Sequence, residues 1–152
     1  MTGERSSDPA AWDAFVAASD PGSYLQLDAW ARVKAANGWS AHRVVAEGPD
    51  GRVGAQVLVR RPRAFPWGFA YAPRGPVLAD WGEPSVVAVT DALRTAAAEL
   101  GRIATLRIDP EIERDGPRDR DGAIRDALRR AGWRPAPSIQ PEATRVIDLA
   151  PD

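Results

Sequence analysis

Hydrophobic positions in the first part of the chain recur at helical spacing. Asp8-Pro9 predicts the start of a helix, because aspartate caps a first turn and proline suits its first position. A second helix is predicted over residues 28–36, where Asn37-Gly38 favours the left-handed conformation that ends a helix. The first of these short helices is amphipathic, with an apolar face made by Trp12, Phe15 and Val16.

The period then changes to the alternation that is typical of strands. Residues 42–46 and 53–60 are predicted strands, and the glycine-bounded turn over residues 48–51 joins them into an antiparallel hairpin. Further strands are predicted over residues 103–108 and 144–149. With the antiparallel hairpin as its clearest pair, the sheet is expected to be mostly antiparallel.

Two more helices are predicted in the second half. One begins at Glu83-Pro84 and is closed by Gly101, and the other covers residues 123–131 with Ile124, Ala127 and Leu128 inward. Helices mixed with a mostly antiparallel sheet indicate an α+β fold, or mixed α/β layers. The long helix is expected to be largely core, through Val86, Val87, Val89, Leu93, Ala96, Ala97 and Leu100.

The stretch from Phe69 to Leu78 begins as a strand and then opens. Pro73 and Pro76 have no amide hydrogen for a ladder, so the strand is expected to stop or splay there. Arg74 lies between them, where an arginine beside bare backbone amides could hold an anionic or peptide-like ligand. The alternative is a strand-to-loop transition with a solvated arginine.

Composition bounds the function classes. By length the 152 residues are one domain, or one domain of a longer protein, and the formal charge of −1 argues against a whole-surface field for nucleic acid. The absence of cysteine and the single histidine, His42, exclude thiolate and multi-histidine metal sites. No run of about 18 apolar residues and no leader pattern occurs, so neither membrane insertion nor export is expected.

Three other groups of side chains are candidates. Lys34 lies on the apolar stripe of the second helix, so either its stem packs and its ammonium reaches water, or the ammonium faces a phosphate or carboxylate. Asp109 and Glu111 follow a strand and could act as a general base and its partner, or hold an amine or an aminoacyl ester, although such pairs are often solvated. A basic loop with Arg60, Arg61 and Arg63 is either solvated or a contact for an RNA backbone.

No nucleophile elbow and no common glycine-rich phosphate loop is present. Several spaced motifs, in order, instead resemble the Fem peptidyltransferases (FemA, FemB, FemX). The match runs roughly from Trp12 to Leu149, and its motifs are Gly22-Ser-Tyr-Leu-Gln-Leu-Asp-Ala-Trp-Ala-Arg-Val-Lys34, Gly38-Trp39, Tyr71-Ala-Pro-Arg-Gly-Pro-Val77, Leu106-Arg-Ile-Asp-Pro-Glu111, Gly132-Trp133, Ile139-Gln-Pro141 and Thr144-Arg-Val-Ile-Asp-Leu149.

This resemblance implies a cytoplasmic bacterial enzyme with an N-acetyltransferase-like (GNAT-like) first domain that has no acetyl-coenzyme A site. Such enzymes move an amino acid from an aminoacyl-tRNA to an amine of a muramyl pentapeptide precursor, and no cofactor or metal is expected. By the resemblance, Lys34 contacts the diphosphate of the precursor, with Trp30 in the same binding site. Tyr71 and Arg74 line the acceptor cleft, and Asp109 lies near the acceptor amine.

The length departs from the family, because Fem enzymes are about twice as long and their second domain completes the site. The chain is therefore expected to be a single domain over residues 1–152, either a fragment or a natural single-domain relative, with a homo-oligomer or a missing second domain as the alternatives. Two other functions stay open: an acyl-coenzyme A-dependent acetyltransferase and a non-catalytic interaction domain. If the chain is a Fem-type transferase, Lys34, Arg74 and Asp109 are expected to share one groove.

Overall fold

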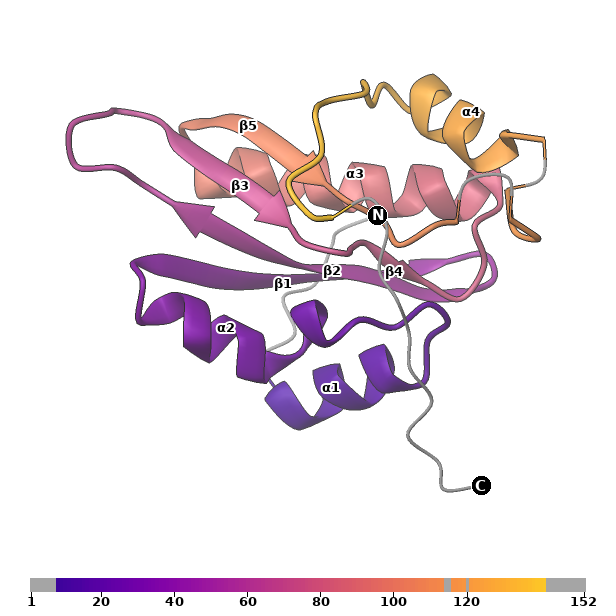
Figure 1. The fold of residues 1–152 in the computed structure, drawn as a ribbon, viewed down its shortest axis with the longest axis horizontal. Coiled ribbons are helices and arrows are strands. Elements are labelled where there is room, and N and C mark those ends of the chain that lie inside the picture. Colours follow the sequence, from indigo (N-terminus) through magenta and orange to yellow (C-terminus); the bar gives the residue numbers. More distant parts are fainter. Residues whose placement is uncertain (1–7, 114–115, 120, 142–152) are drawn as a thin grey trace.

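The computed structural model describes residues 8–113, 116–119 and 121–141, and a mixed sheet lies at its centre (Figure 1). Its strands follow the order β1-β2-β3-β5, and the short β4 pairs with the first part of β2, on the same side as β3. Only the β3–β5 pairing is parallel; the β1–β2, β2–β3 and β2–β4 pairings are antiparallel. The strands are β1 (Trp39–Gly48), β2 (Gly51–Arg60), β3 (Gly68–Ala72), β4 (Val77–Leu78) and β5 (Ile103–Ile108).

Helices pack on both faces of this sheet. The main apolar core lies between the sheet and α3 (Glu83–Leu100), and α4 (Ala123–Arg130) joins the same core. On the other face a smaller core forms around Trp12 of α1 (Pro9–Ala17). The 3₁₀-helix η1 (Tyr24–Gln26) and α2 (Asp28–Ala35) follow α1 on that face. The predicted α+β fold is therefore confirmed.

The predicted elements agree in type with the structure and differ in their ends. β1 runs over Trp39–Gly48 rather than over residues 42–46, because the whole hairpin up to its two-residue turn is paired. The prediction of Val87 as core is wrong: its side chain is 42% exposed. Val86 and Val89 are buried, and at 100° per residue Val87 points away from both toward solvent. The predicted strand over residues 144–149 lies outside the described residues.

A buried glutamine replaces a missing strand partner on β2. The pairing with β3 covers Leu58–Arg60 and the pairing with β4 covers Val53 and Gly54, so Gln56 between them has no partner strand on that side. The fully buried Gln26 of η1 fills this gap. Its Oε1 accepts the Gln56 amide hydrogen at 2.7 Å, and its Nε2 donates to the Pro73 carbonyl at 2.7 Å. Gln26 thereby fixes the place where the sheet splays.

Candidate active site

One face of the sheet carries the polar side chains of interest. Arg43 on β1 forms an ion pair with Asp28 of α2, so the odd-numbered residues of β1 face that helix. Trp39 lies on the same face, and its ring centroid is 6.1 Å from that of Phe69 on β3. Because side chains alternate along a strand, Tyr71 shares this face with Phe69.

β5 adds two charged side chains beside Tyr71. In the parallel β3–β5 register, Tyr71 is the partner of Arg107. Asp109 comes directly after the end of β5, and its Oδ2 accepts a hydrogen bond of 3.1 Å from the Tyr71 hydroxyl. The structure thus brings together Tyr71 and Asp109, two residues that lie 38 positions apart in the chain.

The phenol of Tyr71 stays protonated at neutral pH. The residue is 6% exposed, and burial raises the pKa of Tyr71 to about 12. The hydrogen bond to Gln140 and the charge of Arg107 oppose this rise in pKa, whereas the Asp109 carboxylate adds to it. Tyr71 is therefore a fixed donor, and the carboxylate of Asp109 is the group of the pair that can hold an amine or accept a proton.

The segment that follows α4 contacts the residues at and after the end of β3, through a hydrogen bond between Gln140 and Tyr71 and through Pro141. Arg74 Nη2 donates to the Pro141 carbonyl at 2.9 Å. The guanidinium therefore binds this segment and does not pair with the Asp109 carboxylate. The backbone amide of Asp109 donates to the Gly75 carbonyl at 3.0 Å. Arg74 itself has a φ of 52°, an unusual value for a residue with a side chain. Arg74 thus lies next to a residue that bonds the Asp109 backbone, while its own side chain bonds the Pro141 carbonyl.

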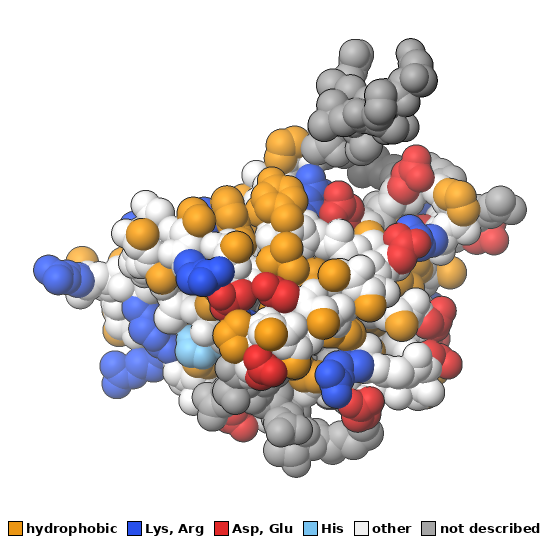
Figure 2. All heavy atoms as spheres, turned by 90° about the horizontal axis from the view of Figure 1, so that it is seen from below, with side chains coloured by type: hydrophobic (Ala, Val, Ile, Leu, Met, Phe, Trp, Pro, Cys, Tyr) orange, Lys and Arg blue, Asp and Glu red, His pale blue; other side chains and the backbone are white. Residues whose placement is uncertain are grey.

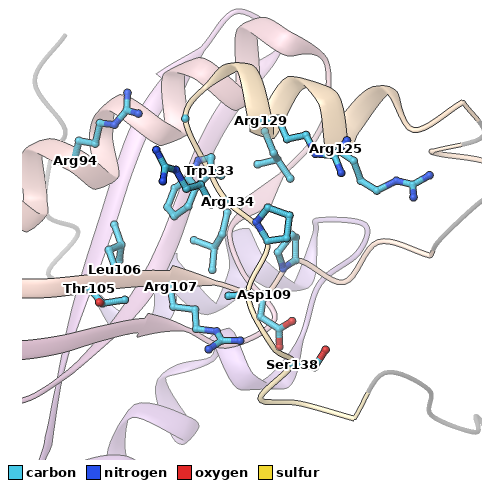
Figure 3. Close-up of a pocket in the computed structure, with 16 residues that line it drawn as sticks. Arg94, Thr105, Leu106, Arg107, Asp109, Arg125, Arg129, Trp133, Arg134 and Ser138 are labelled. Atoms are coloured by element: carbon cyan, nitrogen blue, oxygen red, sulfur yellow. The ribbon is translucent and has the colours of Figure 1, made fainter.

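A cavity of about 780 Å³ opens beside Asp109, between β5 and the segment that follows α4 (Figure 3). In the close-up, Arg107 and Asp109 lie along the β5 side and Trp133 and Arg134 on the opposite side. The residues that line it are Arg94, Thr105, Leu106, Arg107, Ile108, Asp109, Pro110, Arg125, Leu128, Arg129, Gly132, Trp133, Arg134, Pro135, Ala136 and Ser138.

The lining of this cavity is strongly cationic, with five arginines against the one carboxylate of Asp109. Arg125 pairs with Asp119 and Arg129 with Asp126, which reduces their charge toward the cavity. Within the part of the chain that the structure describes, no ion pair engages Arg107 or Arg134. The cavity is therefore suited to an anionic ligand, and phosphate oxygens match the guanidinium fork.

Lys34 lies at the opposite end of the strands from Asp109. Its ammonium is 4.8 Å from the centroid of the Trp30 ring, a cation–π contact within α2. α2 ends close to Trp39, which pairs with the last residue of β2, whereas Asp109 follows the far end of β5 (Figure 1). Lys34 and Trp30 do not line the cavity. Instead of one shared groove, the structure has two positions on one face of the sheet.

Sequence reasoning missed two features of this site. The first is Gln26, which the sequence shows only as one residue of a motif. Its hydrogen bond to the Gln56 amide joins residues 30 positions apart, so no local pattern indicates it. Arg107 and Arg134 were also missed as cavity residues. Their signal is the excess of arginine around β5 and α4, which does not show by itself which of these side chains meet.

No group of three or more metal-binding side chains occurs among the described residues. Likewise, no described helix is both long enough and apolar enough to cross a bilayer.

The class of the domain follows from its sheet and helices: it has the α+β fold of N-acetyltransferase-like proteins. It aligns with the crystal structure of FemX at a TM-score of 0.70, with 26% sequence identity, over 87% of this chain and 32% of that one. The profile of the FemAB family matches residues 8–126. The chain therefore belongs to the FemAB family.

Curated relatives agree with this assignment. A lipid II:glycine glycyltransferase of Staphylococcus aureus (strain MRSA252) is 33% identical over 105 residues, which are 68% of this chain and 24% of that protein. The protein of the same name from S. aureus strain USA300 is 34% identical over the same lengths. The chain thus spans about a quarter of the length of these relatives.

Proposed function

We propose that this chain is the acceptor-binding domain of an aminoacyltransferase that acts on a peptidoglycan precursor. Membership of the FemAB family supports this class, and the similar S. aureus proteins are glycyltransferases that act on lipid II by their names. The observation that carries the proposal is the hydrogen-bonded Tyr71–Asp109 pair at the mouth of a cationic cavity.

In the proposed reaction, an amine of the precursor peptide attacks the ester carbonyl of an aminoacyl-tRNA. The new C–N bond of the amide forms, the C–O bond of the ester breaks, and the tRNA leaves as its hydroxyl. Asp109 would hold the amine by a charge-assisted hydrogen bond, receive the proton that the amine loses, and pass it to the leaving tRNA oxygen. Tyr71 would orient the carboxylate through its 3.1 Å hydrogen bond, so it is a positioning residue.

An elongated acceptor fits the distance between the two positions on the sheet face. β3 has five residues, which span about 16 Å at the usual rise of a strand. A precursor with a diphosphate at one end and a peptide amine at the other could place the diphosphate at Lys34, beside Trp30, and the amine at Asp109. Tyr71 and Arg74 would then flank its peptide.

The donor would approach from the cavity side of Asp109. Arg107 and Arg134 offer guanidinium groups that suit the phosphates near the acceptor end of an aminoacyl-tRNA. In the proposed reaction, a second domain or a second copy of the chain would complete the donor side of the site. The compartment proposed for this reaction is the cytoplasm, where aminoacyl-tRNA is found.

Calorimetric titration with a nucleotide-linked muramyl pentapeptide tests the acceptor site. Binding should be measurable for the wild-type chain and should weaken at least about fivefold in Lys34→Ala, since a phosphate contact on a cation contributes about 1 kcal/mol or more. Arg32→Ala is the matched control, because Arg32 is a solvent-exposed cation on the same helix. Its affinity should stay within about twofold.

Two results would contradict the proposal. One is the absence of binding heat in protein that circular dichroism shows to be folded. The other is thermal stabilisation by acetyl-coenzyme A without stabilisation by the muramyl ligand, which would favour an ordinary acetyltransferase.

A further inference from the structure

The loop between β2 and β3 has a composition that the proposed active site does not use. Its residues 61–67 project at one end of the molecule (Figure 1) and are all exposed. Two large aromatic side chains lie on it: Phe65 is 64% exposed and Trp67 is 49% exposed. Exposed aromatic residues that are this close together usually mark a binding surface.

Arginines lie beside these aromatic residues in the sequence, and no acidic residue occurs in the same stretch. Arg60, Arg61 and Arg63 lie on or beside the loop, and the sequence has no aspartate or glutamate between Asp50 and Asp80. Figure 2 shows Lys and Arg side chains gathered at the left end of the face in view, with no Asp or Glu among them. In the described part of the chain, Arg63 has neither an ion pair nor a hydrogen bond through its side chain.

The base of the loop is fixed, so its tip is presented in a defined direction. Arg61 Nη2 donates to the carbonyls of Leu100 and Gly101, at 2.8 and 3.0 Å, where α3 ends. The Gly68 amide donates to the Arg102 carbonyl at 2.7 Å. Within the loop, the Phe65 amide donates to the Pro62 carbonyl at 3.0 Å. The apolar tip is therefore held away from the body of the domain rather than folded onto it.

We infer that the β2–β3 loop docks on the anionic surface of a lipid bilayer. Trp and Phe partition to the headgroup level of a membrane, and flanking arginines pair with lipid phosphates. A binder of single-stranded RNA would more usually offer a cationic groove with aromatic residues along it. Here the aromatic residues stand on a projecting tip, which favours a broad surface over a strand. The inference concerns peripheral adsorption, not a spanning helix.

The loop lies where it would bring a lipid-linked acceptor to the domain. This biological role, though not the membrane binding itself, rests on the proposed function. Trp39 pairs with Arg60, and α2 ends just before Trp39, so the loop lies at the same end of the domain as Lys34. Adsorption through the loop would place the Lys34 end at the membrane. In a lipid-linked precursor the diphosphate is next to the lipid, and the peptide amine would then reach Asp109 farther from the surface.

Co-sedimentation with vesicles tests the inference without any precursor. The probe is a mixture of phosphatidylglycerol and phosphatidylcholine at 1:1, with pure phosphatidylcholine for comparison. The wild-type chain should sediment with the anionic vesicles and bind them at least about tenfold more tightly than the neutral ones, because each cation near the surface contributes about a fivefold gain. Added salt at about 0.5 M should remove most of this difference.

Variants distinguish binding through the loop from non-specific binding to vesicles. The double variant Phe65→Ala/Trp67→Ala should lose at least about tenfold in vesicle affinity, and Arg63→Ala about fivefold. The matched controls are Val87→Ala, an exposed apolar residue on α3, and Arg52→Ala, an exposed arginine at the other end of β2. Both controls should bind as the wild type does. Circular dichroism and thermal melting establish that every variant is folded.

Insertion itself is measured by fluorescence. Brominated lipids should quench the emission of the wild type more than that of Trp67→Phe, because only Trp67 among the six tryptophans lies in the loop. Three outcomes would overturn the inference: no sedimentation with anionic vesicles, equal losses in the control variants, or loop variants that lose binding to single-stranded RNA while the wild type ignores vesicles. Since the vesicles contain no muramyl ligand, a failure here leaves the calorimetric test of the proposed function intact.

Discussion

Replacing Gln26 by leucine should be among the most destabilising single changes in this domain. The glutamine is fully buried and supplies backbone partners where β2 has no neighbouring strand. Leucine has a similar volume and no polar atoms, so the substitution leaves the Gln56 amide and the Pro73 carbonyl without partners. The third contact, from Gln26 Nε2 to the Gln56 carbonyl at 3.4 Å, is long and adds little.

The magnitude follows from two orphaned groups. Each buried backbone group without a partner costs about 1–3 kcal/mol, so Gln26→Leu should lower the free energy of unfolding by about 2–6 kcal/mol. A domain of this kind has about 5–15 kcal/mol in total. Urea unfolding followed by circular dichroism should show a midpoint lower by about 1–3 M, with an unchanged slope.

Two further variants sharpen this test. Asn37→Leu makes the same amide-to-apolar change at an exposed position, where it removes only the solvent-exposed hydrogen bond of 3.1 Å to the Val33 carbonyl, and it should cost at most about 1 kcal/mol. Gln26→Glu keeps an acceptor for the Gln56 amide but directs a carboxylate oxygen at the Pro73 carbonyl, so it should be as harmful as leucine at pH 7. A cost below about 1 kcal/mol for Gln26→Leu would refute the reasoning.

Three other changes have expected outcomes. Because the folded-state pKa of Tyr71 is raised to about 12, above about 10 in the unfolded chain, its stabilisation is complete below pH 10 and is lost as the pH rises to 12. Over that range the free energy of unfolding of the wild type should fall by about 2 kcal/mol relative to that of Tyr71→Phe. Absorbance at 295 nm should show one phenol that ionises at a higher pH than ordinary tyrosine, and equal losses in both proteins would contradict this. Asp119→Ala removes the carboxylate that accepts from the Ile124 amide at 2.9 Å and should cost about 1–2 kcal/mol in thermal melts, whereas Asp119→Asn should retain part of it. Gly54→Ala puts a Cβ 2.6 Å from the Val44 carbonyl oxygen and 3.2 Å from the Trp12 ring, so it should cost about 1–3 kcal/mol; a neutral result in urea unfolding would show that the hairpin can shift.

The sequence alone predicted the four α-helices, the strands β1, β2, β3 and β5, and their order, but not η1 or β4. Local signals did this work: Asp8-Pro9 at a helix start, the turn over residues 48–51, and the prolines that end the strand after Tyr71. Each of these signals acts within a few residues, through capping, turn geometry or a missing amide hydrogen. They carry no information about which distant segment becomes a neighbour, and Val87 shows that even the inward face of a helix was only partly predicted.

The tertiary structure decided which side chains meet. The Tyr71–Asp109 hydrogen bond depends on the parallel pairing of β3 with β5, and the placement of Lys34 far from Asp109 depends on where α2 crosses the sheet. Gln26 reaches Gln56 and Pro73 only because η1 packs over the splayed strands. Hydrophobic spacing determines which surface of an element is buried, but register and crossing decide its partners, and these are properties of the whole packed chain.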